Sequence, residues 1–143
     1  MSASELSRVI EQSHDALEMI TRGDAEPLKA LFSRRDDVAL ANPFGPPVRG
    51  WEQAAETMER AASNYRDGEV TGFERVTEFE TADLACIVEL ERYRARVGGA
   101  DSLAPIALRV TTILRREEDG WRIVHRHADP ITAPRPADSV VQQ

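Results

Sequence analysis

Hydrophobic residues recur at the spacing of amphipathic helices in the first half of the chain. They predict one helix that starts at a capping box formed by Ser2 and Glu5 and ends at Gly23, followed by a short second helix. The clearest apolar stripe starts at Trp51 and continues at intervals of three and four residues as far as Tyr65. Three helices are therefore expected before the middle of the chain.

The pattern changes to that of β-strands in the second half of the chain. Residues 38–41 are typical of a short strand, and a proline-rich loop over 42–47 follows it. After Gly68 come long runs rich in β-branched and aromatic residues, separated by turn-forming segments at 81–83, 98–102 and 117–120. Helices followed by an antiparallel meander predict an α+β domain whose helices pack on one face of a curved sheet.

Alternation along the strands predicts which side chains face inward. In the strand that begins at residue 84, the even-numbered positions are apolar and the odd-numbered positions include Glu89 and Glu91. The even positions are therefore predicted to face inward, and the two glutamates to pair with Arg109 and Arg115 on the outer face. The next strand has the same parity.

Two strands depart from simple alternation. Apolar residues spaced by three between Phe73 and Phe79 predict a bulge or bend. In the last strand, periodicity does not decide between two faces. One face carries Trp121, Ile123, His125, His127 and Asp129, and the other carries Val124, Arg126 and Ala128.

Composition narrows the class of protein. A length of 143 residues is typical of a single domain. Hydrophobic residues make up 41% of the chain but form no long apolar run, which argues against membrane insertion. A net charge of -7 argues against general nucleic-acid binding. The single cysteine, Cys86, matches no metal-ligand spacing and is predicted to be buried and inert. With the polar N-terminal start, this favours a cytoplasmic protein without metal or cofactor.

One segment carries a specific resemblance to a known family. Residues 38–53, with Asn42-Pro43-Phe44-Gly45 at their centre, resemble the segment of ketosteroid isomerases in which a strand carries an aspartate into a Pro-Phe-Gly loop. With the element order, the chain is similar to the nuclear transport factor 2-like superfamily, beside the SnoaL-like cyclases. The implied fold is a cone over residues 1–130, a cystatin-like roll whose curved antiparallel sheet wraps around N-terminal helices and an internal pocket. A loosely ordered tail is expected over 131–143.

The catalytic groups of the isomerases are not found at the matching positions. Asn42 stands at the position of the aspartate base, Ala16 at that of the tyrosine, and Thr112 nearest to that of the protonated acid. Loss of a positioned base alone usually costs about 10² to 10⁴ in rate. The resemblance therefore does not extend to steroid isomerisation.

The same resemblance implies a set of pocket residues. The expected ligand-binding side chains are Asn42, Met58, Leu90, Thr112 and Arg126. A buried arginine without a partner is very costly. Arg126 is therefore expected to pair with an internal carboxylate or to await an anionic ligand.

A second candidate site lies on the last strand. The Trp-x-x-Val-His-x-His pattern is similar to the last strand of SnoaL-like domains and of kinase association domains. SnoaL-like cyclases place a catalytic aspartate near the end of this strand, where Asp129 is the nearest carboxylate. His127 with Asp129 is a candidate proton carrier, provided that both reach the pocket. The alternative is that this face packs against a second subunit or a loop.

These observations lead to two hypotheses for function. The first is a protein that binds a small, mostly apolar molecule and acts on it as a cofactor-independent isomerase, cyclase or dehydratase. The second is a non-catalytic ligand-binding or dimeric assembly module. Relatives with this fold commonly dimerise through the outer sheet face, so a homodimer is expected in both cases.

Overall fold

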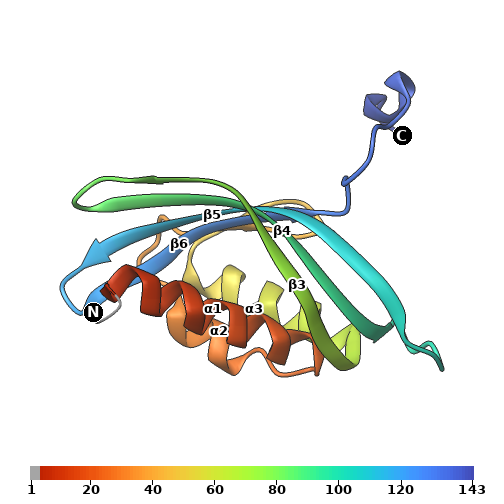
Figure 1. Ribbon diagram of the computed structural model, residues 1–143, viewed down its shortest axis with the longest axis horizontal. Helices are drawn as coiled ribbons and strands as arrows, with labels where there is room; N and C mark the ends of the chain where they lie inside the picture. Colours follow the sequence, from red (N-terminus) through yellow and green to blue (C-terminus); the bar gives the residue numbers. More distant parts are fainter. Residues whose placement is uncertain (1–3) are drawn as a thin grey trace.

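Three helices lie against the concave side of a single curved sheet (Figure 1). The computed structural model describes residues 4–143. The helices are α1 (Glu5–Thr21), α2 (Glu26–Leu31) and α3 (Trp51–Ser63). The strands are β1 (Ala39–Ala41), β2 (Val48–Arg49), β3 (Tyr65–Glu80), β4 (Leu84–Val97), β5 (Ala104–Glu117) and β6 (Gly120–Asp129), and a 3₁₀ turn, η1 (Ala137–Val140), follows. This is the predicted α+β architecture.

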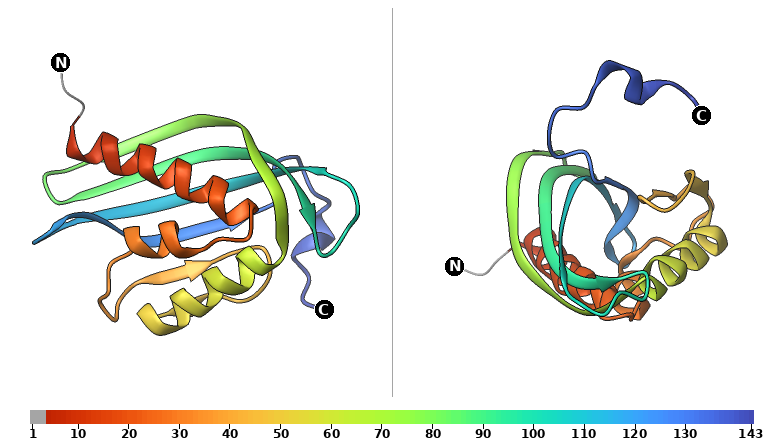
Figure 2. Two further views of the ribbon diagram at one scale, coloured as in Figure 1. Left: turned by 90° about the horizontal axis from the view of Figure 1, so that it is seen from below. Right: turned by 90° about the vertical axis from the view of Figure 1, so that its right-hand side faces the viewer.

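The sheet has the strand order β2-β1-β6-β5-β4-β3. Its four long strands form the predicted antiparallel meander, while the short β1 pairs parallel to β6. Three register shifts interrupt β3, as its irregular apolar spacing predicts. Seen end on, the sheet curls around the helices as an open roll (Figure 2). The core fills the space between the concave face and the helices.

The ends of the helices are set by local contacts. The hydroxyl of Ser4 caps α1 by accepting the N–H of Ser7 at 3.1 Å, whereas Ser2 lies outside the described residues. The third helix ends before Tyr65, which is the first residue of β3. Shortly afterwards Gly68 passes the end of α1 so closely that an added Cβ would lie 2.1 Å from Oγ1 of Thr21. Only glycine permits this approach.

The facing of β4 is opposite to the prediction. Its odd positions, including Ile87, Glu89, Glu91 and Tyr93, are buried on the concave face. The even positions lie on the outer face, so Cys86 is half-buried there and is not part of the core. The prediction was wrong because it placed acidic side chains outside, whereas partners on other elements make their burial possible.

A bulge in β6 explains why periodicity could not choose a face for this strand. Ile123 and His125 pair with adjacent residues of β5, which leaves Val124 between them without a partner. Trp121 and Ile123 face the core before the bulge, and Arg126 faces it beyond the bulge. Each of the two predicted faces is therefore the inner one for half of the strand.

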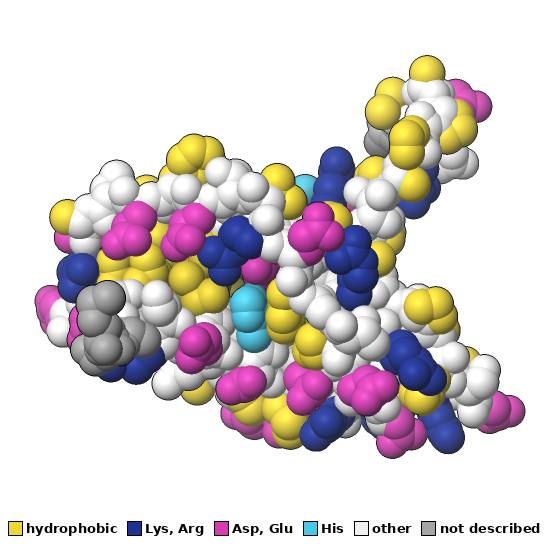
Figure 3. Space-filling view, in the orientation of Figure 1, with side chains coloured by type: hydrophobic (Ala, Val, Ile, Leu, Met, Phe, Trp, Pro, Cys, Tyr) yellow, Lys and Arg dark blue, Asp and Glu magenta, His cyan; other side chains and the backbone are white. Residues whose placement is uncertain are grey.

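The C-terminal segment leaves the body of the domain. After β6 the chain projects outward and forms η1 close to its C-terminus (Figure 1). Val140 is 88% exposed and Val141 63% exposed. Figure 3 shows hydrophobic side chains on this projecting segment. Among residues 4–143, no helix has both the length and the apolar character that crossing a bilayer requires.

Candidate ligand-binding cavity

A cavity of about 60 Å³ lies between the helices and the concave face of the sheet. Typical small-molecule sites occupy about 300–1,000 Å³, so only a very small molecule fits without movement of the wall. Most of the wall is apolar. It includes Leu17, Ile20, Leu28, Leu40, Met58 and Leu108.

Five polar side chains belong to this largely apolar wall: those of Thr21, Asn42, Tyr65, Tyr93 and Arg126. The hydroxyls of Thr21 and Tyr93 already donate to Glu18 and Glu91, so the donors free for a ligand come from Asn42, Tyr65 and Arg126. The amide oxygen of Asn42 accepts the N–H of Phe44 at 2.9 Å, which leaves the amide NH₂ as its free group. The hydroxyl of Tyr65 makes no hydrogen bond with residues 4–143, and no fully buried side-chain polar atom in this range lacks a partner. This hydroxyl is therefore not fully buried, and it belongs to a residue that lines the cavity.

Arg126 is held from behind by a buried carboxylate. Its Nη1 and Nη2 atoms donate to Oε2 and Oε1 of Glu91, each at 2.8 Å. The hydroxyl of Tyr93 donates to the same Oε1 at 2.5 Å. Glu91 is completely buried, and Tyr93 is 3% exposed. The three side chains form a fixed cluster, hereafter the Glu91 cluster, of which Arg126 and Tyr93 reach the cavity wall.

The surroundings of Arg126, Tyr93 and Tyr65 keep all three side chains protonated. Burial alone would lower the pKa of Arg126, but the adjacent Glu91 outweighs burial and raises the pKa above its usual value. Burial and the charge of Glu91 hold the pKa of Tyr93 well above the ordinary range. Burial also raises the pKa of the Tyr65 hydroxyl. Both tyrosines are therefore protonated at neutral pH and act as hydrogen-bond donors.

The proline-rich loop contributes Pro43 and Phe44 to the cavity wall, next to Asn42. The ring of Phe44 meets the ring of Tyr65 edge-on, with the two centroids 5.7 Å apart. Phe44 lines both the cavity and a second hollow on the outer side of the loop, and it is half-exposed. Prolines restrict the backbone on both sides of Phe44, so the position of this loop against the cavity is fixed locally.

The structure brings some of the predicted pocket residues together and separates others. Asn42, Met58 and Arg126 line the cavity. Thr112 faces inward and is buried, but it lies outside the cavity wall. Leu90 was predicted to line the pocket and does not: it sits on the outer face, because the whole of β4 faces the opposite way.

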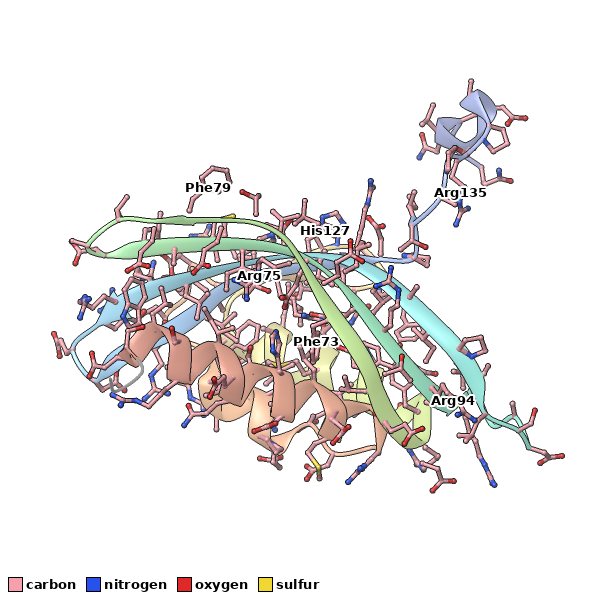
Figure 4. The ribbon with its side chains drawn as sticks, viewed as in Figure 1. Phe73, Arg75, Phe79, Arg94, His127 and Arg135 are labelled. Carbon is pink, nitrogen blue, oxygen red and sulfur yellow. The ribbon has the colours of Figure 1, made fainter. Side chains whose placement is uncertain are left out.

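His127 and Asp129 lie on the outer side of the sheet. Figure 4 shows His127 on the side of β6 that faces away from the helices. Asp129 accepts a 2.8 Å hydrogen bond from Nε of Arg109 and lies 3.3 Å from Nε2 of His127. Burial raises the pKa of Asp129, but the hydrogen bonds from Arg109 and from the backbone of Ile131, with the charge of Arg109, together outweigh burial and lower the pKa. No cluster of three or more potential metal ligands occurs within residues 4–143.

A second buried carboxylate lies outside the cavity wall. Glu89 pairs with Nε2 of His14 on α1 at 2.8 Å and with Nε of Arg75 on β3 at 3.3 Å. The His14 ring stacks on Phe73, with centroids 3.7 Å apart. Figure 4 shows Phe73 and Arg75 near this seam between α1 and β3. We call these residues the Glu89 cluster.

Sequence reasoning missed Glu91 and Tyr93 as parts of the site. A signal for them was present in the sequence. Arg92, Arg94 and Arg96 occupy the even positions of the same strand, and a run of three arginines indicates a solvent-facing side. If the even-numbered positions of the whole strand face solvent, the odd-numbered positions, including Glu91 and Tyr93, face the interior.

Known proteins resemble the chain in both sequence and structure. The family model of the SnoaL-like domain matches residues 9–133. No curated protein matches the chain. Among solved structures, an NTF2-like protein from Streptomyces avermitilis that is named as a candidate dehydratase has a TM-score of 0.73 at 21% identity, over 90% of this chain and 95% of that one. A ketosteroid isomerase-like protein from Erwinia carotovora atroseptica has a TM-score of 0.72 at 19% identity, over 92% of this chain and 100% of that one.

A third similar structure comes from Salmonella enterica serovar Typhimurium. It is an NTF2-like superfamily protein with a TM-score of 0.72 at 17% identity, over 97% of this chain and 95% of that one. Identities this low establish a common fold and leave activity open. The family match covers most of the chain, including every strand and the cavity, and on this ground the chain belongs to the SnoaL-like domain family.

Proposed function

We propose that this protein binds a small, mostly apolar molecule in the cavity between the helices and the sheet, and that it does so without acid–base catalysis. The observation that carries the proposal is the chemistry of the wall. It combines an apolar surface with the hydrogen-bond donors of Asn42, Tyr65 and Arg126. A few convergent polar groups in an apolar pocket are the usual arrangement of a small-molecule site.

The absence of a proton acceptor from the cavity wall supports a binding role. Proton transfer near neutral pH usually needs a histidine or a carboxylate within hydrogen-bond reach of the substrate. None of the residues that line the cavity is of either type. Glu91 lies behind Arg126, where both of its oxygens already accept hydrogen bonds. We also propose a cytoplasmic location, because a single cysteine, Cys86, suits a reducing compartment.

A small β-hydroxy ketone tests binding and catalysis together. We expect 4-hydroxy-2-butanone to shift the amide NMR signals of cavity residues and to remain unchanged during prolonged incubation. A dehydratase would convert it into a conjugated enone, which is detected by its ultraviolet absorption. Enone formation at a rate above that of the buffer would contradict the binding-only proposal.

A matched pair of variants on α3 checks the location. Ala61 lines the cavity, whereas Ala55 on the same helix is equally half-buried but lies outside the wall. Ala61→Leu should fill the cavity and abolish the shifts, and Ala55→Leu should preserve them. Equal loss in both variants would place the binding site elsewhere.

A second candidate function is a cofactor-independent isomerase, cyclase or dehydratase. Two observations favour it: the similar structure named as a candidate dehydratase, and the free hydroxyl of Tyr65 close to Arg126. This arrangement could polarise a carbonyl oxygen. If product forms in the incubation above, Tyr65→Phe should slow it by about 10² to 10³. An unchanged rate would exclude Tyr65 as the polarising group.

We further propose that the protein is a homodimer that associates through the outer face of the sheet. This face carries the exposed side chains of Phe79 and Leu84 and the half-buried Val88. Such an apolar patch on a sheet is a common contact surface. Val88→Asp should halve the mass measured by light scattering, and Leu103→Asp, in the distant β4–β5 loop, should not. A monomeric wild-type protein would contradict this proposal.

A further inference from the structure

The charge of Arg126 is already neutralised inside the protein. Glu91 accepts hydrogen bonds from both terminal nitrogens of the guanidinium group and carries one negative charge against its one positive charge. Glu91 has no exposed surface, and the side chain of Arg126 is only 10% exposed, so water screens the pair weakly. The polar end of the cavity is therefore electrically balanced before any ligand enters.

Arg126 nevertheless keeps donors for a ligand. A guanidinium group has more N–H groups than the two that bind Glu91, and the group has no other acceptor within residues 4–143. The amide NH₂ of Asn42 and the hydroxyl of Tyr65 add further donors to the same cavity. The groups offered to a ligand are thus donors without net charge.

We propose that Glu91 determines the charge selectivity of the cavity: by neutralising Arg126 it restricts the site to uncharged molecules that carry a hydrogen-bond acceptor, such as a ketone, ester or amide. This inference deepens the proposed binding function and depends on it. It departs from the sequence-based alternative in which Arg126 awaits an anionic ligand.

An anionic ligand is disfavoured because its negative charge would lie near the negative charge of Glu91. An anionic group that reached the N–H donors of Arg126 would lie close to the Glu91 carboxylate, whose charge is poorly screened because Glu91 has no exposed surface. It would also lose its own hydration, with no free positive charge to compensate. A carbonyl oxygen accepts the same hydrogen bonds without either cost.

Propionamide and propionate form a matched pair of probes, because they have nearly the same shape and differ by one charge. Binding of each to the full-length protein is measured by titration of the amide NMR signals of cavity residues. We expect propionamide to bind about tenfold more tightly than propionate, or more, because of the buried like charge. Equal affinities, or tighter binding of propionate, would overturn the inference.

Two glutamate variants identify the residue responsible. Glu91→Gln leaves Arg126 with an uncompensated charge, so propionate should gain affinity and the ratio should fall to about one or reverse. Glu89→Gln is the control, because Glu89 is buried on the same face of β4 but pairs with His14 and Arg75 outside the cavity wall. It should leave the ratio unchanged. Circular dichroism establishes that each variant is folded at the temperature of the titration.

The outcomes separate this inference from the proposed function. One outcome is that propionamide binds the wild-type protein, but the ratio of the affinities for propionamide and propionate is the same in Glu91→Gln. In that case the cavity binds ligands, and Glu91 does not determine which ligand charge the cavity accepts. If neither probe shifts cavity signals in the wild-type protein, the proposed binding function fails and the inference fails with it. If Glu91→Gln does not fold, equal wild-type affinities for the two probes, or tighter binding of propionate, still overturn the inference.

Discussion

Glu91 and Glu89 lie two residues apart on the same face of β4, yet their surroundings differ. The partners of Glu91 are Arg126 and Tyr93, both nearly inaccessible to water. The partners of Glu89 are His14 and Arg75, whose side chains are 22% and 34% exposed. One carboxylate belongs to the wall of a cavity, and the other joins a helix to the edge of a sheet.

The different exposure of their partners gives the two buried glutamates of β4 different roles. In the Glu91 cluster every hydrogen bond is inside the domain, so the arrangement is fixed and depends little on salt or pH. In the Glu89 cluster water reaches the partners, which weakens the ion pairs. The Glu91 cluster therefore controls what the cavity can accept, whereas the Glu89 cluster contributes to the docking of α1.

The largest expected effect is the loss of one partner in the Glu91 cluster. Glu91→Gln should lower the free energy of unfolding by about 3 kcal/mol or more, because it leaves a buried charge unpaired. Urea denaturation measures this loss. The double variant Glu91→Leu with Arg126→Met should be more stable than Glu91→Gln, because it removes both charges. A double variant that is less stable than the single one would show that the pair itself stabilises the fold.

The next effect in size concerns the Glu89 cluster. Glu89→Gln should cost about 1 to 2 kcal/mol, since its partners are partly exposed and regain hydration when they are released. The same denaturation experiment measures it. If Glu89→Gln proved as costly as Glu91→Gln, exposure of the partners would not be what distinguishes the two clusters.

The pH dependence of stability sharpens the comparison. Burial raises the pKa of Glu89, but its hydrogen bonds and charge interactions with His14 and Arg75 together outweigh burial and hold the pKa below its ordinary value of 4.5. A lowered folded-state pKa stabilises the protein above the unfolded-state pKa, and this stabilisation is lost as the pH falls through the folded-state value. The stability difference between the wild-type protein and Glu89→Gln should therefore shrink below about pH 4.5. A difference that grew there would reverse the sign of this linkage.

The smallest effect is expected on the outer face. Asp129→Asn removes a carboxylate whose partner Arg109 is half-exposed, so stability should change by no more than about 1 kcal/mol. Ligand binding measured by NMR titration should be unchanged, because Asp129 lies on the opposite side of the sheet from the cavity. Loss of binding or of any turnover in this variant would restore Asp129 as a candidate catalytic residue.

Much of the fold could be predicted because helical periodicity and turn residues are local signals. The stripe from Trp51 and the hairpin turns placed α3 and the four long strands. The resemblance of the Pro-Phe-Gly segment to ketosteroid isomerases implied a cavity lined by Asn42, and Asn42 does line one. The stripe, the turns and this motif each lie within a short stretch of neighbouring residues, which one chain displays directly.

The rest depended on contacts between distant residues. Burial of Glu91 is possible only because Arg126, 35 positions later, turns inward. That orientation depends in turn on the bulge at Val124, which no periodic pattern announces. Hydrophobicity alone therefore assigned β4 to the wrong face and placed Leu90 in the pocket.

The bulge at Val124 also limits how residues of related proteins can be matched to this one. A relative whose last strand is regular presents the opposite alternation after the corresponding position, even when its sequence aligns without a gap. An aspartate that enters the interior of such a relative would then align with Asp129, which faces outward here. Two aligned residues of this strand are therefore equivalent only if both strands have the same bulge. Without that check, a residue that faces the interior of one protein would be given the same chemical role as a residue that faces the outside of the other.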